Sequence, residues 1–232
     1  YTYAAAGLYD VSLTVTSDSG CTHTVTKQVE VFNNPTAAFT TTDVCFGTAA
    51  NFNSSASNGN GETIDQWSWD FDYDGTTHTS DDITQTPSYN YLTPGTYDVQ
   101  LIVTTTNGCS DTIVESINIF SLPEAGFTFN NVCFGTLMSF TDTSNTNSGT
   151  INSWSWDFQN NGTVDNNNQN PTHGYPNSGN YDVELMVETS EGCKDSIIQT
   201  VYVHPLPVAD FSATSVCSSQ ETVFTDASTI SS

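Results

Sequence analysis

The chain has 232 residues, with 26 Asp and Glu against only 2 Lys and Arg, and a formal net charge of −24 at pH 7. Because almost no basic side chain is present to neutralise phosphates, this balance argues against nucleic acid and anionic membrane surfaces as partners. Aromatic residues make up 12% of the chain, which disfavours disorder, and no apolar run of about 18 residues predicts a membrane-spanning helix.

The sequence repeats itself with a period of about 86 residues. Tyr-Asp-Val at 9–11 recurs at 97–99 and 181–183, and Trp-Ser-Trp-Asp-Phe at 67–71 recurs at 154–158. The cysteines form two registers with similar spacing: Cys21, Cys109 and Cys193 in one, and Cys45, Cys133 and Cys217 in the other. Coincident registers of this kind indicate a tandem array.

The repeat boundaries predict four segments. Residues 1–33 are expected to be the C-terminal part of one repeat, 36–120 and 122–204 two complete repeats, and 208–232 the N-terminal part of a following repeat. Since half a repeat leaves its apolar face uncovered, we interpret the chain as a window from a longer protein. The linkers at 33–35, 121–123 and 204–207 contain Pro, whose fixed φ limits bending.

Within each repeat the apolar residues alternate with a period of two. Tyr97, Val99, Leu101 and Val103 alternate with other residues, which predicts a half-buried strand. The Asn-Gly pair in 106–109 predicts a tight hairpin after it. The aromatic residues of 67–71 share one strand face, and no segment shows helical periodicity. About seven short strands in roughly 85 residues are typical of a β-sandwich.

Trp-Ser-Trp-Asp-Phe, then Asn-Pro-Thr-His-x-Tyr at 170–175, then Gly-x-Tyr-x-Val-x-Leu-x-Val resembles the PKD (polycystic kidney disease) domain. The resemblance implies an all-β fold of tandem immunoglobulin-like sandwiches in a linear array, used as spacers and adhesive modules of extracellular proteins. The Thr- and Asn-rich, Cys-containing form is similar to repeats in giant secreted proteins of Bacteroidota. The Gly-Asp-Gly usual after Trp-Asp-Phe is replaced here by other residues at 72–75 and 159–162.

The immunoglobulin-like topology that this resemblance implies suggests how the cysteines pair. In such a sandwich the A–B connection and the F–G hairpin lie at opposite ends, over 20 Å apart for strands of about seven residues, which is too far for a disulfide. In a head-to-tail array these two ends of successive repeats meet. We therefore expect Cys45 to pair with Cys193, and the other cysteines to pair with repeats outside the chain: Cys21, Cys109, Cys133 and Cys217. Buried thiols and bridges between chains are the alternatives.

The loop after the first Trp-Ser-Trp-Asp-Phe has carboxylates at the spacing of a calcium loop. Asp70, Asp72 and Asp74 alternate before Gly75, and Asp81 falls at the twelfth position. The second copy has Gln159 in place of Asp72. The alternative is a polar turn without an ion, in which the first Asp caps the turn. No cofactor is required, and calcium is the one ion that the pattern suggests.

Other candidate sites are weaker. The four His are scattered, no Gly-x-Ser-x-Gly or phosphate-binding loop occurs, and no carboxylate pair is set apart, so an enzyme is not expected. Thr112 and Ser196 follow Asp, the pattern of Bacteroidota O-glycosylation, although both also suit a strand. The outer Trp67 and Trp154 could either pack on the core or form a sugar-stacking platform.

These observations predict a structural, non-enzymatic array that forms an extracellular fibre, stalk or adhesin filament at the cell surface. Its expected partners are further copies of the same repeat, self-association into filaments, and a surface polysaccharide or glycoprotein. The alternative is a carbohydrate-binding or spacer region of a secreted polysaccharide-degrading enzyme.

Overall fold

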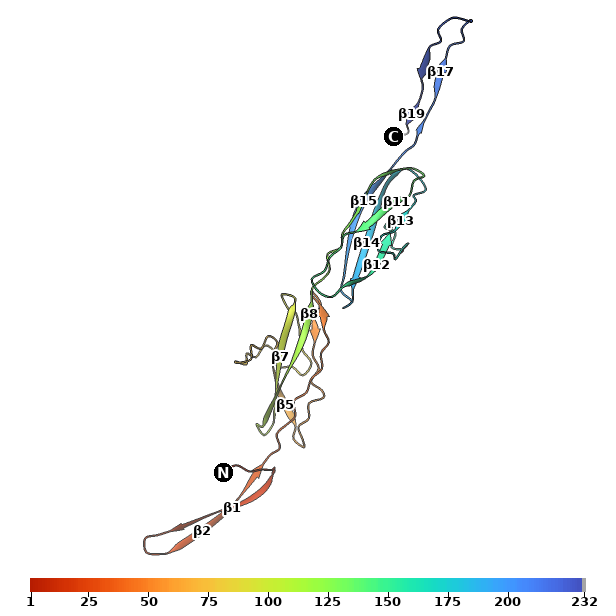
Figure 1. Ribbon diagram of the computed structural model, residues 1–232. Coiled ribbons are helices and arrows are strands. Elements are labelled where there is room, and N and C mark those ends of the chain that lie inside the picture. Colours follow the sequence, from red (N-terminus) through yellow and green to blue (C-terminus); the bar gives the residue numbers. More distant parts are fainter. Residues whose placement is uncertain (231–232) are drawn as a thin grey trace. The chain divides into compact units, whose positions relative to one another are not determined.

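The computed structural model describes residues 1–230, and every regular element in this range is a β-strand (Figure 1). The all-β prediction is therefore confirmed. Nowhere in the described range is there a helix of the length and apolarity that crossing a membrane requires. The chain divides into two compact units, Tyr1–Phe120 and Ser121–Ser232.

Strands β3–β8 of the first unit recur in the same order as β10–β15 of the second. The first unit contains β1 (Gly7–Thr16), β2 (Thr22–Val31), β3 (Val44–Cys45), β4 (Ala50–Asn51), β5 (Ile64–Asp70), β6 (Ser88–Tyr89), β7 (Gly95–Thr105) and β8 (Ser110–Phe120). The second unit contains β9 (Phe127–Phe129), β10 (Val132–Cys133), β11 (Met138–Asp142), β12 (Ile151–Asp157), β13 (Thr172–His173), β14 (Gly179–Thr189), β15 (Lys194–His204), β16 (Pro207–Val208), β17 (Phe211–Ala213), β18 (Phe224–Asp226) and β19 (Thr229–Ile230).

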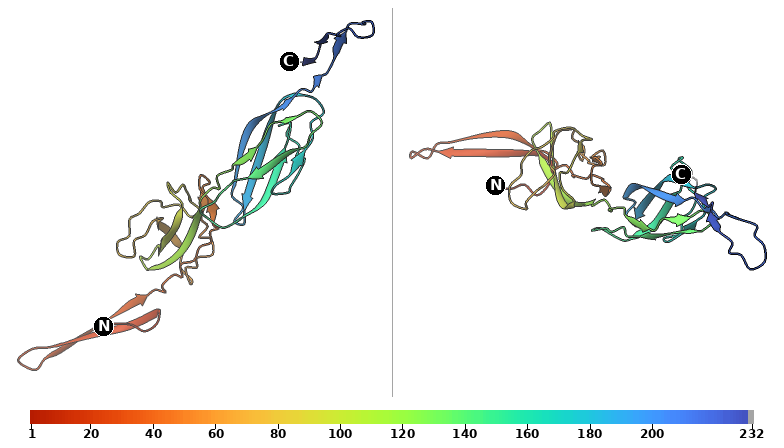
Figure 2. Two further views of the ribbon diagram at one scale, coloured as in Figure 1. Left: turned by 45° about the horizontal axis from the view of Figure 1, so that its top comes forward. Right: turned by 90° about the horizontal axis from the view of Figure 1, so that it is seen from above.

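Each unit contains one complete sandwich. In the first sandwich, formed by β3–β8 and the segment before them, one sheet has the order β3-β8-β7-β5 and the facing layer contains β4 paired with β6. In the second sandwich, formed by β9–β15, the corresponding sheets are β10-β15-β14-β12 and β13-β11-β9. Figures 1 and 2 show the long hairpin strands β14 and β15 side by side, as their continuous register requires. The predicted sandwich architecture is confirmed.

The alternation of apolar residues places one face of each long strand in the core. Val99, Leu101 and Val103 on β7 are fully buried, and so are Trp69 near the end of β5 and Phe71 directly after that strand. The second core repeats this arrangement with these buried residues: Trp156, Phe158, Val183, Leu185 and Val187. Aromatic rings of the two layers pack against one another, as Phe52 does on Trp69 and Phe140 on Trp156, and such large side chains help a chain of modest apolar content to build two cores.

A tyrosine fixes the entry into each long hairpin. The hydroxyl of Tyr97 donates to the carbonyl oxygen of Thr93 at 2.9 Å, and that of Tyr181 donates to the carbonyl oxygen of Asn177 at 3.0 Å. This is the tyrosine corner of immunoglobulin-like sandwiches, in which a Tyr near the start of strand F bonds the backbone a few residues upstream. Tyr9 makes the same bond to Ala5 before β1, so the hairpin β1–β2 repeats the hairpin β7–β8.

The turn of each long hairpin depends on a glycine directly before a cysteine. Gly108 and Gly192 have φ values of +81° and +83°, which a residue with a Cβ atom rarely adopts. The amide of Thr105 donates to the carbonyl oxygen of Cys109 at 2.9 Å across this turn. The predicted Asn-Gly hairpin is present, and its geometry places Cys109 and Cys193 at the hairpin end of their sandwiches.

Candidate functional site

The two cysteine registers lie at opposite ends of each sandwich. Cys45, the last residue of β3, is in parallel register with Phe120, the last residue of β8. Cys109 directly precedes β8, which is 11 residues long. At a rise of about 3.3 Å per residue, roughly 35 Å separate Cys45 from Cys109, whereas a disulfide requires Cα atoms within about 7 Å. A bond between these two cysteines of one sandwich is therefore excluded by the strand register.

The second sandwich has the same arrangement. Cys133 pairs in parallel register with His204 at the end of β15, and Cys193 directly precedes the start of that strand. In both sandwiches the backbone amide of the residue after the cysteine adds a hydrogen bond at the end of this parallel strand pair. The amide of Phe46 donates to the carbonyl oxygen of Phe120, and that of Phe134 donates to the carbonyl oxygen of His204, both at 2.8 Å. Each sandwich thus carries one cysteine at each of its two ends.

Two of the six cysteines are disulfide-bonded and four are free thiols. Cys45 and Cys193 are disulfide-bonded, and Cys193 is almost fully buried. The remaining cysteines of the described chain are free thiols: Cys21, Cys109, Cys133 and Cys217. The two bonded cysteines are those that the sequence analysis pairs with each other, and the free ones are those that it assigns to further repeats.

Chain connectivity shows which end of each sandwich leads to the next. The Asp195 carboxylate, at the hairpin end of β15, accepts a hydrogen bond from the amide of Ala125 at 2.9 Å. The first strand of the second sandwich therefore begins at the end that carries Cys193. The first sandwich ends at Phe120, beside Cys45. The chain leaves one sandwich at its A–B cysteine end and enters the next at its hairpin cysteine end.

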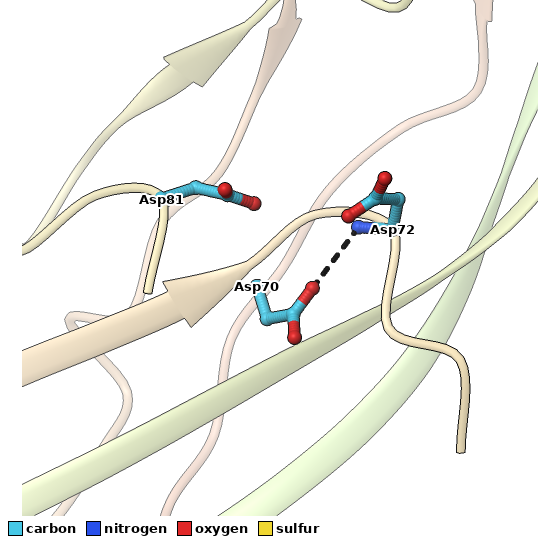
Figure 3. Close-up of side chains that lie close together, drawn as sticks. All are labelled: Asp70, Asp72 and Asp81. Atoms are coloured by element: carbon cyan, nitrogen blue, oxygen red, sulfur yellow. Dashed lines mark hydrogen bonds between the residues drawn. The ribbon is translucent and has the colours of Figure 1, made fainter. Parts of the chain in front are cut away.

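The acidic loop brings together three of its four candidate ligands. Oxygen atoms of Asp70, Asp72 and Asp81 all lie within 4.8 Å of one another (Figure 3). Asp70 is buried at the end of β5, whereas the other two are exposed. The sequence spacing therefore identified a real cluster of carboxylates.

Backbone hydrogen bonds hold this cluster. One carboxylate oxygen of Asp70 accepts from the amide of Asp72 at 3.3 Å, and the other accepts from the amide of Thr79 at 2.7 Å. Asp81 accepts from the amide of Phe71 at 2.9 Å. Asp70 thus also has the turn-capping role that the sequence analysis left as the alternative.

Asp74 lies outside this group, unlike the sequence expectation. Its carboxylate accepts from the amides of Thr76 and Thr77, at 2.8 and 3.0 Å, and from the Thr76 hydroxyl at 2.7 Å. The hydrogen bonds from the Thr77 amide and from Thr76 lower the pKa of Asp74. Asp74 closes its own local turn, as Asp side chains commonly do by accepting from the backbone two residues later, and it is not among the clustered carboxylates.

The second loop has the same scaffold without the third carboxylate. Asp157 accepts from the amides of Gln159 and Gly162, at 3.1 and 2.7 Å, and Asp165 accepts from the amide of Phe158 at 2.8 Å. The side-chain amide of Gln159, which replaces Asp72, bonds the His173 ring instead. The two loops share this capping pattern but differ in length, since the capped amide and its Asp are 10 residues apart in the first loop and 7 apart in the second. Only the first loop has a third carboxylate beside the pair.

A histidine that the sequence did not single out fixes the acidic loop onto the sheet. The His78 ring lies between the Ser68 hydroxyl, at 2.8 Å, and the Gln100 side-chain oxygen, at 2.7 Å. Its other neighbour is the Asp70 carboxylate at 4.0 Å. These partners are 10 and 22 residues away and belong to no motif, so only the fold brings them together.

The two candidate glycosylation residues lie on exposed strand positions, Thr112 on β8 and Ser196 on β15. The Asp before each has a structural role, because Asp111 accepts from the amide of Ala37 and Asp195 accepts from that of Ala125. The Asp of the pattern is therefore explained by the fold alone, and modification of the hydroxyls stays a prediction.

The comparisons with known proteins agree with this architecture. A protein-family model described as "PKD domain" matches residues 33–119 and 121–205, well over half of the chain. Comparison with curated proteins gives no match.

Three solved structures are similar to parts of the chain. The PKD1 domain of Vibrio anguillarum Epp is 28% identical, with 35% of this chain and 93% of that domain covered and a TM-score of 0.32. The PKD1 domain of the Vibrio cholerae metalloprotease PrtV is 33% identical, with 35% and 96% covered and a TM-score of 0.32. The fibronectin(III)-like modules of Clostridium thermocellum CbhA are 14% identical, with 72% and 95% covered and a TM-score of 0.43.

Replacing Asp70 with Ala is expected to destabilise the first sandwich by about 2 kcal/mol or more, because two amides lose their acceptor at a buried position. Asp72→Ala in excess chelator is expected to change stability by less than about 0.5 kcal/mol or to raise it, since it removes one of three mutually repelling charges. Hydrogen–deuterium exchange of β5 and β7 measures both effects.

Gln159→Ala is the matched control, because it alters the same position of the second loop. If Asp72→Ala destabilised the first sandwich as strongly as Asp70→Ala in chelator, the separation of a capping role from a charge cluster would be wrong.

Proposed function

We propose that this chain, which belongs to the PKD domain family, is a non-enzymatic structural segment of an extracellular fibre, stalk or adhesin filament. The observation that carries the proposal is the placement of one cysteine at each end of every complete sandwich. A repeat that can be joined covalently at both ends suits a tensile element. The Thr- and Asn-rich composition supports a cell-surface protein of the Bacteroidota type as its context.

The proposed bond joins Cys45 of the first sandwich to Cys193 of the second. Both cysteines are disulfide-bonded, and the strand register keeps each of them a full strand length from the other cysteine of its own sandwich. Between Phe120, beside Cys45, and Ala125, beside the Cys193 turn, the chain can extend at most about 18 Å. The length of this linker is compatible with a bond between the two cysteine turns.

Such a bond would change how the array carries force. Tension that enters the first sandwich would pass from β3 through Cys45 and Cys193 into the hairpin β14–β15, in parallel with the linker at 121–124. The linker could then not be stretched alone, and bending at the junction would be restricted. Extracellular surroundings favour such bonds, since cytosolic thiols are kept reduced.

Peptide mapping under non-reducing conditions is expected to recover Cys45 linked to Cys193, and thiol titration of the unfolded chain is expected to find four free thiols. In Cys45→Ser the titration should rise to five, because Cys193 loses its partner. Cys133→Ser, altered at the equivalent position of the next sandwich, should lower the count to three. Recovery of Cys45 linked to Cys109 would show that both the pairing and the strand register are wrong.

We also propose that the acidic loop of the first sandwich binds calcium. Ca²⁺ takes oxygen ligands at about 2.3–2.6 Å, so two ligands of one ion lie at most about 5 Å apart. The carboxylates of Asp70, Asp72 and Asp81 fulfil this condition, with oxygens within 4.8 Å. The two Asp that accept backbone hydrogen bonds retain lone pairs for an ion. The net charge of −24 favours divalent cations at the surface.

Added Ca²⁺ is expected to raise the melting temperature of the chain, because an ion that binds only the folded state stabilises it by mass action. Asp72→Gln copies the second loop and should abolish the increase, whereas Gln159→Ala should keep it. Differential scanning calorimetry with Ca²⁺ and with chelator measures the effect. An identical melting temperature in both conditions would contradict the calcium proposal and leave the disulfide proposal intact.

The second candidate function is a carbohydrate-binding or spacer region of a secreted polysaccharide-degrading enzyme. It is favoured by the half-buried Trp154 on the surface of the second sandwich, which adjoins a polar cavity. The two functions are compatible, since an adhesive filament also needs a ligand. They differ in what else the full protein contains, and a catalytic domain in the same reading frame would favour the second.

A further inference from the structure

The second sandwich has an open cavity of about 420 Å³ between β11, β12 and the loops beside them. This volume falls within the range of small-molecule sites, about 300–1,000 Å³. Its floor includes Trp154 and Ile151 from β12. The polar side chains around it include Asp142, Asn145, Thr146, Thr150 and Gln169.

The Asp142 carboxylate orients the indole ring of Trp154 in the cavity. The Trp154 ring nitrogen donates to Asp142 at 2.8 Å, and the Gln169 side-chain amide donates to the same oxygen at 3.1 Å. The other oxygen of Asp142 accepts from the amide of Ser144 at 2.9 Å. The indole orientation is therefore fixed before any ligand arrives, which lowers the ordering cost of binding.

The charges at the cavity indicate the class of ligand. Burial raises the pKa of Asp142, but the hydrogen bonds from Ser144, Gln169 and Trp154 outweigh it and the net direction is down, so the carboxylate stays ionised at neutral pH. The Glu191 carboxylate also lies against Gly149, which lines the cavity. No Lys or Arg is among the lining residues, so an anionic ligand is disfavoured.

The rest of the lining favours a neutral polyhydroxylated ligand over a cation. Asp142 is the single carboxylate among the lining residues, whereas the acidic loop of the first sandwich gathers three. What remains at the rim are neutral amides and hydroxyls from Asn145, Thr146, Thr150 and Gln169, which can both donate and accept hydrogen bonds. An aromatic surface beside such groups matches a sugar ring, which has an apolar C–H face and a hydroxyl edge.

The first sandwich provides an internal comparison. Its equivalent of Asp142, two residues after the buried core Phe of the same strand, is Ser54. Ser54 is fully buried and donates to the carbonyl oxygen of Gln85 at 2.8 Å. The ring nitrogen of Trp67, the equivalent of Trp154, is buried and has no hydrogen-bond partner in the described structure. The carboxylate that orients the indole is thus particular to the second sandwich.

We infer that the cavity formed by Asp142, Trp154 and Gln169 is a binding subsite for a neutral sugar residue of a polysaccharide or glycan. The ring would stack on the exposed part of the Trp154 indole, and its hydroxyls would bond the side chains of Gln169 and Thr150. The proposal rests on the second candidate function, for which it names the ligand class and the site, and it does not depend on the disulfide or on calcium.

Affinity electrophoresis of the intact chain tests the inference, because its net charge of −24 drives migration in a native gel. The gels contain one soluble polysaccharide each: xylan, mannan, laminarin, glycol chitin or the anionic alginate. We expect retardation by at least one neutral polysaccharide. Asp142→Ser, the first sandwich's residue, should weaken it about tenfold or more, because Trp154 and Gln169 lose the charged acceptor that orients them.

Gln169 is exposed, so Gln169→Ala should leave the fold intact, as a thermal melt checks, and should also weaken retardation. The matched controls are Gln85→Ala and Trp67→Phe in the first sandwich, which should migrate like the unaltered chain. The inference is overturned if no neutral polysaccharide retards the chain, if alginate alone does, or if folded Asp142→Ser and Gln169→Ala are retarded like the unaltered chain. Each of these outcomes leaves the cysteine pairing untouched.

Discussion

The parallel pairing of β3 with the last residues of β8 is the constraint on which the account of this protein depends. It involves only Val44 and Cys45 opposite Ile119 and Phe120, yet it determines where the A–B turn lies. Because β8 is one uninterrupted strand, the turn with Cys45 must lie a whole strand length from the hairpin with Cys109. The same pairing recurs between β10 and β15. The two ends of a sandwich are therefore chemically alike but cannot react with each other.

The acidic residues stabilise individual turns in addition to giving the chain its negative charge. Many carboxylates accept backbone hydrogen bonds in turns, as Asp70, Asp74 and Asp157 do, so they are part of the fold. The first acidic loop differs by placing a third carboxylate, Asp72, beside two that the turn already requires. In the second loop an amide stands at that position and bonds a histidine. The candidate cation site therefore differs from the second loop in this carboxylate and in the longer loop that carries it.

Much of the fold could be read from the sequence because it depends on periodicity and repetition. Alternation in 97–103 predicted β7, Asn-Gly predicted its hairpin, and the coincident registers predicted the tandem units. The carboxylate cluster was predicted apart from Asp74, whose local turn with Thr76 and Thr77 competes with the calcium-loop pattern. The contacts of His78 with Ser68 and Gln100 could not be predicted, since loop conformation alone brings them together. The hydrogen bond from Trp154 to Asp142 could not be predicted from the repeat pattern either, because the first repeat has Ser54 at the position equivalent to Asp142.

Stretching a single chain by its two termini shows whether Cys45 and Cys193 join successive sandwiches. The proposed bond encloses about 150 residues, which correspond to roughly 50 nm of extended chain at about 3.6 Å per residue. If the bond is present, the fully extended length in reductant should exceed that without reductant by roughly this amount. Equal lengths in both conditions, or a gain of roughly 23 nm as a bond between Cys45 and Cys109 would give, would contradict it.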